Sequence, residues 1–255
     1  MTSHGFLQDR VAVVTGAGKG IGRAIAEAFD AEGAVVVVSD IDEGAAKEVA
    51  GQLSRGEAVV CDVRDESAVQ ALIRGTAQRH GKVDIAVANA GVAIVKPLAE
   101  TSLADWRAVT SVNLDGVFLT VREAALAMAA TGGGSIIVLS SITALRGSPL
   151  IGSYAASKAG VVNLTKTAAT EFRPFGVRVN ALLPTFTNTD LVNDNIPIFS
   201  AALGGDFEPL IAQKQVRMGE IGDITPLAVF LAGDQAGFIT GSEYVVDNGW
   251  TASLL

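Results

Sequence analysis

The stretch "SYAASKAG", residues 153–160, places a tyrosine phenol and a lysine ammonium four positions apart among small side chains. On a helix, residues i and i+4 share a face, so Tyr154 and Lys158 would lie one above the other. A phenol has a pKa of about 10, and a nearby cation lowers that value because it favours the phenolate. The pair therefore predicts a proton-transfer site. The structural alternative is a packed tyrosine ring beside a lysine that extends into solvent.

A second candidate is the glycine loop "TGAGKGIG", residues 15–22, which follows a short apolar run and opens a helical one. Glycines permit a tight turn and let the backbone approach a pyrophosphate, whose charge then lies on the free amides of the helix N-terminus. The spacing is G-x-x-x-G-x-G rather than the G-x-G-x-x-G of the dinucleotide fingerprint. A purely structural turn is the alternative, but the position between a strand and a helix favours a dinucleotide.

Asp40 ends the next apolar run, where a carboxylate can accept hydrogen bonds from an adenosine ribose and would repel a 2′-phosphate. Lys19 favours NADP instead, because it offers a cation to a phosphate. Since Ile41 follows Asp40 and no arginine stands ready for a 2′-phosphate, NAD is expected and NADP is the alternative. For Asp40 the structural alternative is a turn aspartate that opens the helix at 43–53.

The elements that must position these residues are visible as alternating patterns. Seven short β-branched runs are separated by longer stretches of helical periodicity at 20–32, 43–53, 65–80, 102–130, 152–173 and 224–233. The runs are "RVAVVT", "AVVVVS", "EAVVC", "VDIAVAN", "GSIIVLS", "GVRVNALL" and "EYVVD". Strands that are apolar on both faces and alternate with helices predict an α/β Rossmann fold: a doubly wound, seven-stranded parallel sheet with helices on both faces.

No repeat or linker divides the chain, so a single domain is expected over residues 1–255. Residues 184–216 form an exception, because they contain Pro184, Pro197 and Pro209 and show no clear periodicity. A long irregular segment in a compact domain is usually a lid or a binding loop, so we expect 184–216 to be a substrate lid.

Composition restricts the possible partners. The 255 residues are 49% hydrophobic, which supports a large core, but no apolar run approaches the roughly 20 residues that a membrane helix needs. The first ten residues lack the pattern of a secretory signal, and Cys61 is the single cysteine. With two histidines, a metal site is not expected. A net charge of −8 argues against nucleic acid or membrane as a partner, so we expect a cytoplasmic protein.

Together these features resemble the short-chain dehydrogenase/reductase family over essentially the whole chain. The motifs that carry the resemblance are "TGAGKGIG", "CDV" at 61–63, "ANAG" at 88–91, Asn113, "SS" at 140–141, "YAASK" at 154–158, Pro184 and "ITGSEYVVDNG" at 239–249. The resemblance implies a catalytic set of Asn113, Ser141, Tyr154 and Lys158. Ser141 would hold the substrate oxygen, Lys158 the nicotinamide ribose, and Asn113 would kink its helix and hold a water on the proton path. Ser140 is the alternative to Ser141.

The resemblance also implies a set of cofactor-binding residues. They are Gly16, Gly18, Lys19, Gly20, Ile21, Gly22, Asp40, Ile41, Asp62, Val63, Asn89, Ala90, Gly91, Tyr154, Lys158, Pro184, Thr187 and Thr189. Asp62 and Val63 match positions that contact adenine, and Thr189 matches one that holds the carboxamide. Asn89 could instead brace the central strand.

The chain departs from the family pattern at three places. Ala88 stands where an asparagine is usual, and Thr185 and Asn248 stand where glycine is common. A threonine at 185 has less backbone freedom than glycine, so the geometry of the lid is in doubt. None of these changes removes a catalytic group.

The expected function is hydride transfer between NAD and a secondary alcohol or ketone. Residues 92–98, 142–152 and 195–207 are mostly apolar, with Lys96, Arg146 and Asp206 as scattered charges, which suits an apolar or cyclic substrate. Two alternatives stay open: an NADPH-dependent biosynthetic ketoreductase of the 3-oxoacyl type, and a non-catalytic nucleotide-binding sensor. The resemblance also implies a homotetramer that buries the apolar helices 102–130 and 152–173 and the C-terminal "SEYVVDNGWTASLL".

Overall fold

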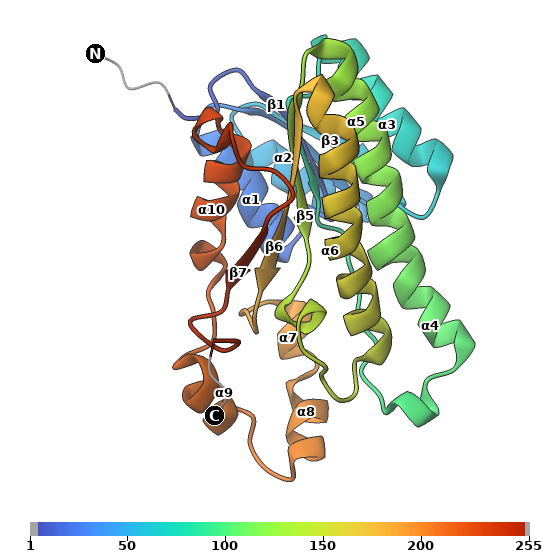
Figure 1. Cartoon of the computed structure of the whole chain (residues 1–255), viewed down its shortest axis with the longest axis vertical. Helices are drawn as coiled ribbons and strands as arrows, with labels where there is room; N and C mark the ends of the chain where they lie inside the picture. The colour runs from blue at the N-terminus through green and yellow to red at the C-terminus, as the bar shows by residue number, and fades with distance from the viewer. Residues whose placement is uncertain (1–4, 253–255) are drawn as a thin grey trace.

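The computed structural model describes residues 5–252, and within them a sheet of seven parallel strands forms the centre of the molecule (Figure 1). The strands are β1 (Val11–Thr15), β2 (Val35–Asp40), β3 (Gly56–Val60), β4 (Ile85–Ala88), β5 (Gly134–Leu139), β6 (Val177–Pro184) and β7 (Glu243–Val246). They lie in the order β3-β2-β1-β4-β5-β6-β7, and all neighbours are parallel. The predicted fold class is confirmed. The ends of the predicted 1–255 domain, residues 1–4 and 253–255, lie outside the described residues.

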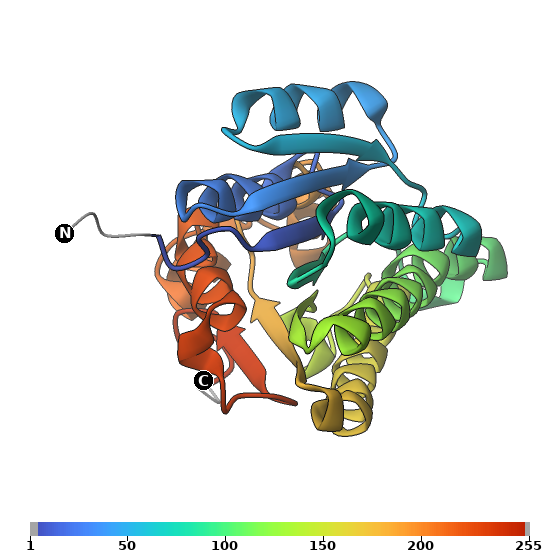
Figure 2. The same ribbon diagram turned by 90° about the horizontal axis from the view of Figure 1, so that it is seen from above.

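Helices cover both faces of the sheet, as the sequence predicted (Figure 2). One face packs against α1 (Gly20–Ala31), α2 (Glu43–Gln52) and α10 (Thr225–Ala232), and the other against α3 (Glu66–His80), α5 (Val117–Thr131) and α6 (Gly152–Phe172). Val14 belongs to the first layer and Val13 to the second, which explains why the strands are continuous apolar runs. The strand order reverses between β1 and β4, so the crevice at this switch point lies beyond the carboxyl ends of these strands.

The helical stretch expected at 102–130 is divided in the structure. It comprises α4 (Leu103–Thr110), a π-helical turn (Ser111–Gly116) and α5. A π-helical turn accommodates an extra residue and occurs mostly at functional sites. Periodicity alone did not reveal this turn, because the apolar pattern continues across it.

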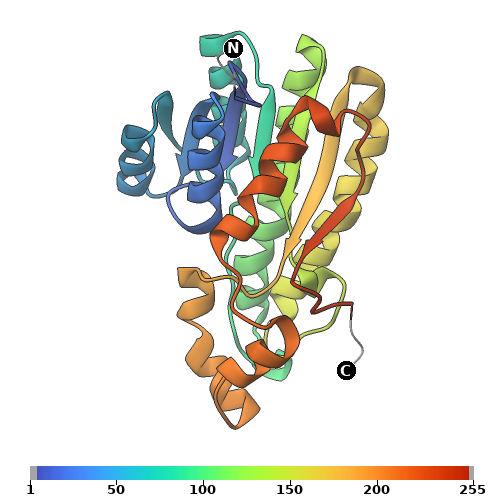
Figure 3. The same ribbon diagram turned by 90° about the vertical axis from the view of Figure 1, so that its left-hand side faces the viewer.

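The expectation that residues 184–216 are irregular is wrong. This segment forms three short helices: α7 (Asp190–Asn193), α8 (Ile196–Leu203) and α9 (Glu208–Gln215). Pro197 and Pro209, which suggested a loop, lie in the first turns of α8 and α9, where proline is tolerated because its position needs no amide donor. Gly204 ends α8 in the left-handed conformation. Figures 1 and 3 show these helices beyond the carboxyl ends of the strands.

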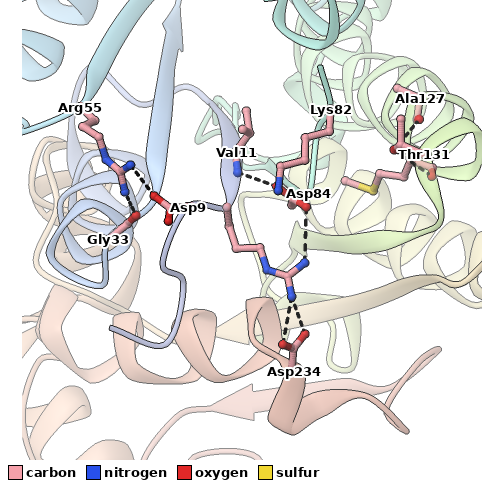
Figure 4. Close-up of polar contacts among 11 residues, drawn as sticks. Asp9, Val11, Gly33, Arg55, Lys82, Asp84, Ala127, Thr131 and Asp234 are labelled. Atoms are coloured by element: carbon pink, nitrogen blue, oxygen red, sulfur yellow. Dashed lines mark hydrogen bonds and ion pairs between the residues drawn. The ribbon is translucent and has the colours of Figure 1, made fainter. Parts of the chain in front are cut away.

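At the opposite end of the sheet, a polar network holds the amino ends of β1 and β4 together (Figure 4). Asp84 accepts a hydrogen bond of 2.7 Å from the Val11 amide and lies within ion-pair distance of Arg10 and Lys82. Arg10 also forms two hydrogen bonds with Asp234. Within residues 5–252, the structure contains no helix both long and apolar enough to cross a bilayer.

Candidate active site

Tyr154 and Lys158 lie in the first turns of α6, beside the end of β5. The Lys158 Nζ donates a hydrogen bond of 2.6 Å to the carbonyl oxygen of Leu139 and lies 5.6 Å from the centre of the Tyr154 ring. Lys158 is only 3% exposed, so the alternative in which its amine extends into solvent is not what the structure shows. The four-residue spacing therefore brings the two groups together in a buried site.

The two serines at the end of β5 have different partners. The hydroxyl of Ser141 accepts a hydrogen bond of 3.2 Å from the Thr143 amide, and Ser141 lines the same two cavities as Tyr154, described below. The hydroxyl of Ser140 donates to the Lys158 carbonyl oxygen at 2.8 Å. Ser141 thus lies beside the tyrosine, whereas Ser140 fastens α6 to the sheet. The geometry favours Ser141 over its neighbour as the residue that meets a substrate oxygen.

Asn113 lies in the π-helical turn and is fully buried. Its Oδ1 accepts a hydrogen bond of 2.8 Å from the Val92 amide, and its Nδ2 donates one of 2.9 Å to the Val92 carbonyl oxygen. The side chain therefore fixes the segment after β4 against the helix. Its expected kink is present as the π-helical turn, while its part in a proton path stays a prediction.

The expectation that Lys158 and the positive nicotinamide ring together make Tyr154 acidic stays a prediction, and burial of the pair acts against it. Burial raises the pKa of the Tyr154 hydroxyl, and the hydrogen bond with Ser141 acts in the opposite direction. Burial also lowers the pKa of Lys158 to about 8. The Lys158 amine is directed at the Leu139 carbonyl oxygen rather than at the phenol. Burial therefore favours the neutral phenol, and positive charge nearby would favour the phenolate.

The side chain of Asn89, directly after β4, holds the glycine loop through hydrogen bonds. The Asn89 Nδ2 donates hydrogen bonds of 2.9 Å to the carbonyl oxygens of Thr15 and Gly16. Gly16 has a φ of 63°, a conformation that favours glycine, and a Cβ at Gly22 would lie 2.4 Å from the Asn89 Nδ2. The alternative in which Asn89 braces the structure is thus observed, although Asn89 also lines the cleft described below.

Asp40 supports the same loop. Its Oδ2 accepts a hydrogen bond of 2.9 Å from the Gly18 amide, and its Oδ1 accepts one of 3.0 Å from the Asp42 amide. The bond to the Asp42 amide is the turn contact that the structural alternative for Asp40 describes, whereas the cap of α2 is Asp42, which accepts from the Ala45 amide. Asp40 is therefore free of the cap and faces the cleft with its carboxylate.

A cleft of about 620 Å³ joins these residues. The predicted residues that line it are Gly16, Lys19, Gly20, Ile21, Asp40, Ile41, Asp62, Val63, Asn89, Ala90, Gly91, Ser141, Tyr154, Lys158, Pro184, Thr187 and Thr189. Three other predicted residues, Gly18, Gly22 and Asn113, do not line the cleft. They lie behind its wall, where they contact Asp40, Asn89 and Val92 respectively.

Two cations at this cleft are already paired. Arg64, which sequence reasoning missed when it found no arginine available, lines the cleft and contacts the Asp62 carboxylate at 2.6 Å. Hydrogen bonds from Arg64 lower the pKa of Asp62. Lys19 lies 3.9 Å from Asp190 of α7, and both side chains are largely exposed. Arg64 was missed because it is distant from Asp40 in sequence, and only the pairing of β2 with β3 brings their ends together.

The cleft fits a dinucleotide. Lys19, at the start of α1, provides no side-chain cap, whereas Asp42 and Asp65 cap α2 and α3. The first amides of α1 are therefore available to a phosphate. A Cβ at Gly20 would meet only the Thr189 methyl, at 3.9 Å, so glycine leaves open space there. The cleft extends from Asp40 to Tyr154, which suits an elongated ligand with its adenosine at one end and its reactive ring at the other.

A second cavity of about 70 Å³ adjoins Tyr154 and Ser141. Residues of each predicted wall segment line it: Ala93 and Val95 of 92–98, Ile142, Thr143 and Ile151 of 142–152, and Asn195 and Phe199 of 195–207. The scattered charges Lys96, Arg146 and Asp206 do not, and Lys96 forms an ion pair of 3.0 Å with Asp105. Thr185, Phe186, Leu191 and Val192 also line this cavity, and they lie in the segment 184–216 that was expected to be a substrate lid, outside the wall expected at 195–207. The resulting wall is mostly apolar.

A doubly wound parallel sheet with a dinucleotide-sized cleft that ends at a half-buried tyrosine and a buried lysine defines a class of nucleotide-dependent oxidoreductases. A family model described as enoyl-(acyl carrier protein) reductase matches residues 16–251. A cis-4-hydroxycyclohexanecarboxylate dehydrogenase from Sinomonas cyclohexanicum is 40% identical, and the match covers 96% of this chain and 97% of that protein. An NADP-dependent (R)-specific alcohol dehydrogenase from Lentilactobacillus kefiri is also 40% identical, with coverages of 96% and 98%.

Among solved structures, a short-chain alcohol dehydrogenase from Sinorhizobium meliloti, described as putative in its name, superimposes with a TM-score of 0.90. It is 35% identical, and the match covers 97% of this chain and 98% of that one. The chain belongs to the short-chain dehydrogenase/reductase family. It is an NAD(P)-dependent oxidoreductase that acts on CH–OH donors.

Proposed function

We propose that this enzyme transfers a hydride between NAD and an apolar or cyclic secondary alcohol, or the matching ketone, with Tyr154 as general acid and base. The observation that carries the proposal is the meeting of Tyr154, Ser141 and Lys158 where the large cleft adjoins the apolar cavity. The two relatives named above act on alcohols by their names, and one acts on a cyclohexane ring that bears a hydroxyl group.

In this mechanism the hydroxyl of Ser141 holds the substrate oxygen beside the Tyr154 phenol. Tyr154 accepts the alcohol proton during oxidation and returns it during ketone reduction. Bound NAD supplies the hydride acceptor and the positive charge of its ring. That charge would favour the phenolate, which burial disfavours because it raises the pKa of the phenol. Lys158 then has a hydrogen-bonding role toward the ribose.

For the cofactor, the charges at the cleft support NAD over NADP. The Asp40 carboxylate faces the cleft and would repel a 2′-phosphate, whereas Arg64 and Lys19 are paired with Asp62 and Asp190. The backbone amides of the glycine loop and of α1 would hold the pyrophosphate. The alternative is NADP, which the Lentilactobacillus kefiri relative uses by its name. An NADPH-dependent ketoreductase is therefore the rival within the same chemistry.

The test uses purified protein with NAD or NADP and a panel of linear and cyclic secondary alcohols, with the absorbance of the reduced nicotinamide as readout. We expect turnover with NAD, and a fall of about 10²- to 10⁴-fold in kcat for Tyr154→Phe. NAD binding to that variant, measured by calorimetry, should stay within about twofold. Unchanged turnover would remove Tyr154 from the mechanism, and no turnover of any alcohol would favour the sensor alternative. A tenfold preference for NADP would overturn the proposed cofactor.

We also propose that the enzyme is a homotetramer. Large apolar side chains on α4 and α5 are exposed, among them Leu103, Trp106, Phe118 and Leu126, with exposures of 62%, 36%, 43% and 52%. Burial of such side chains would stabilise an association of subunits. Light scattering after size-exclusion chromatography measures the mass directly. A monomer at micromolar concentration would contradict this proposal.

A further inference from the structure

Gln215, the last residue of α9, connects the two ends of segment 184–216. Its Oε1 accepts a hydrogen bond of 2.6 Å from the Thr185 hydroxyl. Its Nε2 donates hydrogen bonds of 2.8 Å to the carbonyl oxygens of Phe186 and Arg217. The side chain is 1% exposed, and its oxygen and both of its N–H donors are used. One buried side-chain amide thus joins the chain just after β6 to the chain just after α9.

The same point is held from the C-terminal side. The backbone oxygen of Gln215 accepts a hydrogen bond of 2.7 Å from Asn248 Nδ2. Asn248 has a φ of 47° and follows β7, the edge strand of the sheet. Thr185 and Asn248 are two of the three places where this chain departs from the family pattern, in which glycine is common. Glycine has no side chain to make either bond, so both departures converge on Gln215.

The conformation of Val216, the residue after Gln215, indicates that the backbone is constrained here. Val216 has a φ of 70°, an unusual conformation for a β-branched residue, and its side chain is 74% exposed. Such a conformation persists only where the surroundings enforce it. The bonds of Gln215 to both neighbouring segments are a sufficient cause, since the Val216 side chain is largely in solvent.

These contacts affect the walls of both cavities. Thr185 and Phe186 line the small cavity beside Tyr154, and Thr187 and Thr189, further along the same segment, line the large cleft. Gln215 itself lines neither cavity. We infer that Gln215 is a positioning residue that fixes the start of segment 184–216 and so shapes the substrate-binding wall; this role rests on the proposed function. Tyr154, Ser141 and Lys158 lie on other elements and are not held by it.

The test compares steady-state kinetics at saturating NAD for variants of this contact. Thr185→Val removes the hydroxyl and keeps the shape, so we expect KM for the alcohol to rise about five- to tenfold with kcat within about twofold. Thr185→Ser keeps the hydroxyl, so its KM should lie closer to the wild-type value than that of Thr185→Val. Gln215→Leu should raise KM at least tenfold. The double variant Thr185→Val/Gln215→Leu should be no worse than Gln215→Leu, because each change removes the same bond.

Thr76→Val is the matched control, because Thr76 is fully buried on α3 and donates its hydroxyl to the Leu72 carbonyl oxygen, away from both cavities. Its KM should equal that of the wild type even if its Tm falls. If Thr185→Val also lowers Tm and leaves KM unchanged, the contact is only structural and the inference is wrong. Additive effects of Thr185→Val and Gln215→Leu on KM would likewise contradict it.

Hydrogen–deuterium exchange provides a readout that does not need turnover. Segments 186–188 and 219 are paired by backbone hydrogen bonds of 2.9 Å from Gly219 to Phe186 and of 2.8 Å from Asn188 to Gly219. In Gln215→Leu these amides should exchange at least tenfold faster, whereas exchange in α3 stays unchanged. Equal exchange in variant and wild type would overturn the inference. A wild-type protein that oxidises no alcohol would refute the proposed function, while this measurement still decides the role of Gln215.

Discussion

Replacement of Gly22 tests how the glycine loop is held. A Cβ at this position would lie 2.4 Å from the Asn89 Nδ2 and 2.4 Å from the Gly16 carbonyl oxygen, distances that real Cβ contacts do not show. The Gly16 carbonyl oxygen belongs to the main chain and cannot shift easily, so we expect the Asn89 side-chain amide to move. That movement breaks its hydrogen bonds to the carbonyl oxygens of Thr15 and Gly16, both 2.9 Å long.

The magnitude follows from opposing effects. Overpacking costs about 1–3 kcal/mol, and each lost hydrogen bond costs about 1 kcal/mol. Alanine in a helix gains roughly 0.5–1 kcal/mol over glycine. We therefore expect Gly22→Ala to lower the free energy of unfolding by about 2–4 kcal/mol. For a chain of this size, that corresponds to a decrease in Tm of about 4–16 °C.

Gly51→Ala is the control, because Gly51 lies in α2 and a Cβ there would have nothing within 4 Å. It should raise the free energy of unfolding by roughly 0.5–1 kcal/mol through helix propensity alone. Denaturant unfolding measures both variants, and calorimetry measures NAD binding, which we expect to weaken at least tenfold in Gly22→Ala only. A Gly22→Ala protein as stable as the wild type, with the same NAD affinity, would refute the argument that the Asn89 contact holds the loop.

Other substitutions test separate parts of the molecule. Asp40→Ala should reduce the ratio of the NADP to the NAD dissociation constant at least tenfold. The affinity for both cofactors should also fall, because the Gly18 amide loses its acceptor. An unchanged ratio would show that Asp40 does not discriminate between the two cofactors. Lys158→Met tests whether folding lowers the pKa of this lysine. Burial lowers the pKa of Lys158 to about 8, so between pH 8 and 10 the unfolded chain binds more protons than the folded chain. The contribution of Lys158 to the free energy of unfolding therefore rises with pH in this range. Between pH 8 and pH 10 the free energy of unfolding should rise by about 2 kcal/mol less in the variant than in the wild type. If the free energies of both proteins change equally with pH, the lowered pKa of Lys158 is contradicted. Asp84→Ala should lower the free energy of unfolding by about 2–4 kcal/mol, because the Val11 amide loses its partner, with little change in kcat; a change below 0.5 kcal/mol would show that the network is dispensable.

Sequence patterns predicted the features that depend on residues close together in the chain, namely the strands, the long helices and the pairing of side chains one helical turn apart. Periodicity identified the seven strands and the helices that cover them, and the spacing of Tyr154 and Lys158 predicted their shared face. The short helices in 184–216 were missed because proline was interpreted as a breaker, although Pro197 and Pro209 begin helices. The contacts of Gln215 could not be predicted, since they join residues about thirty positions apart.

Burial is the property that the sequence could least predict, and it changes the chemistry of the site. The four-residue spacing places an amine near a phenol, but whether the amine acidifies the phenol depends on what else surrounds both groups. Here Lys158 is directed at the Leu139 carbonyl oxygen, while Arg64 and Lys19 are paired with Asp62 and Asp190. The cations at the cleft thus all have partners before any ligand binds. We therefore expect backbone amides of the glycine loop to contribute to recognition of an anionic dinucleotide, and the positive ring of bound NAD to contribute to activation of Tyr154.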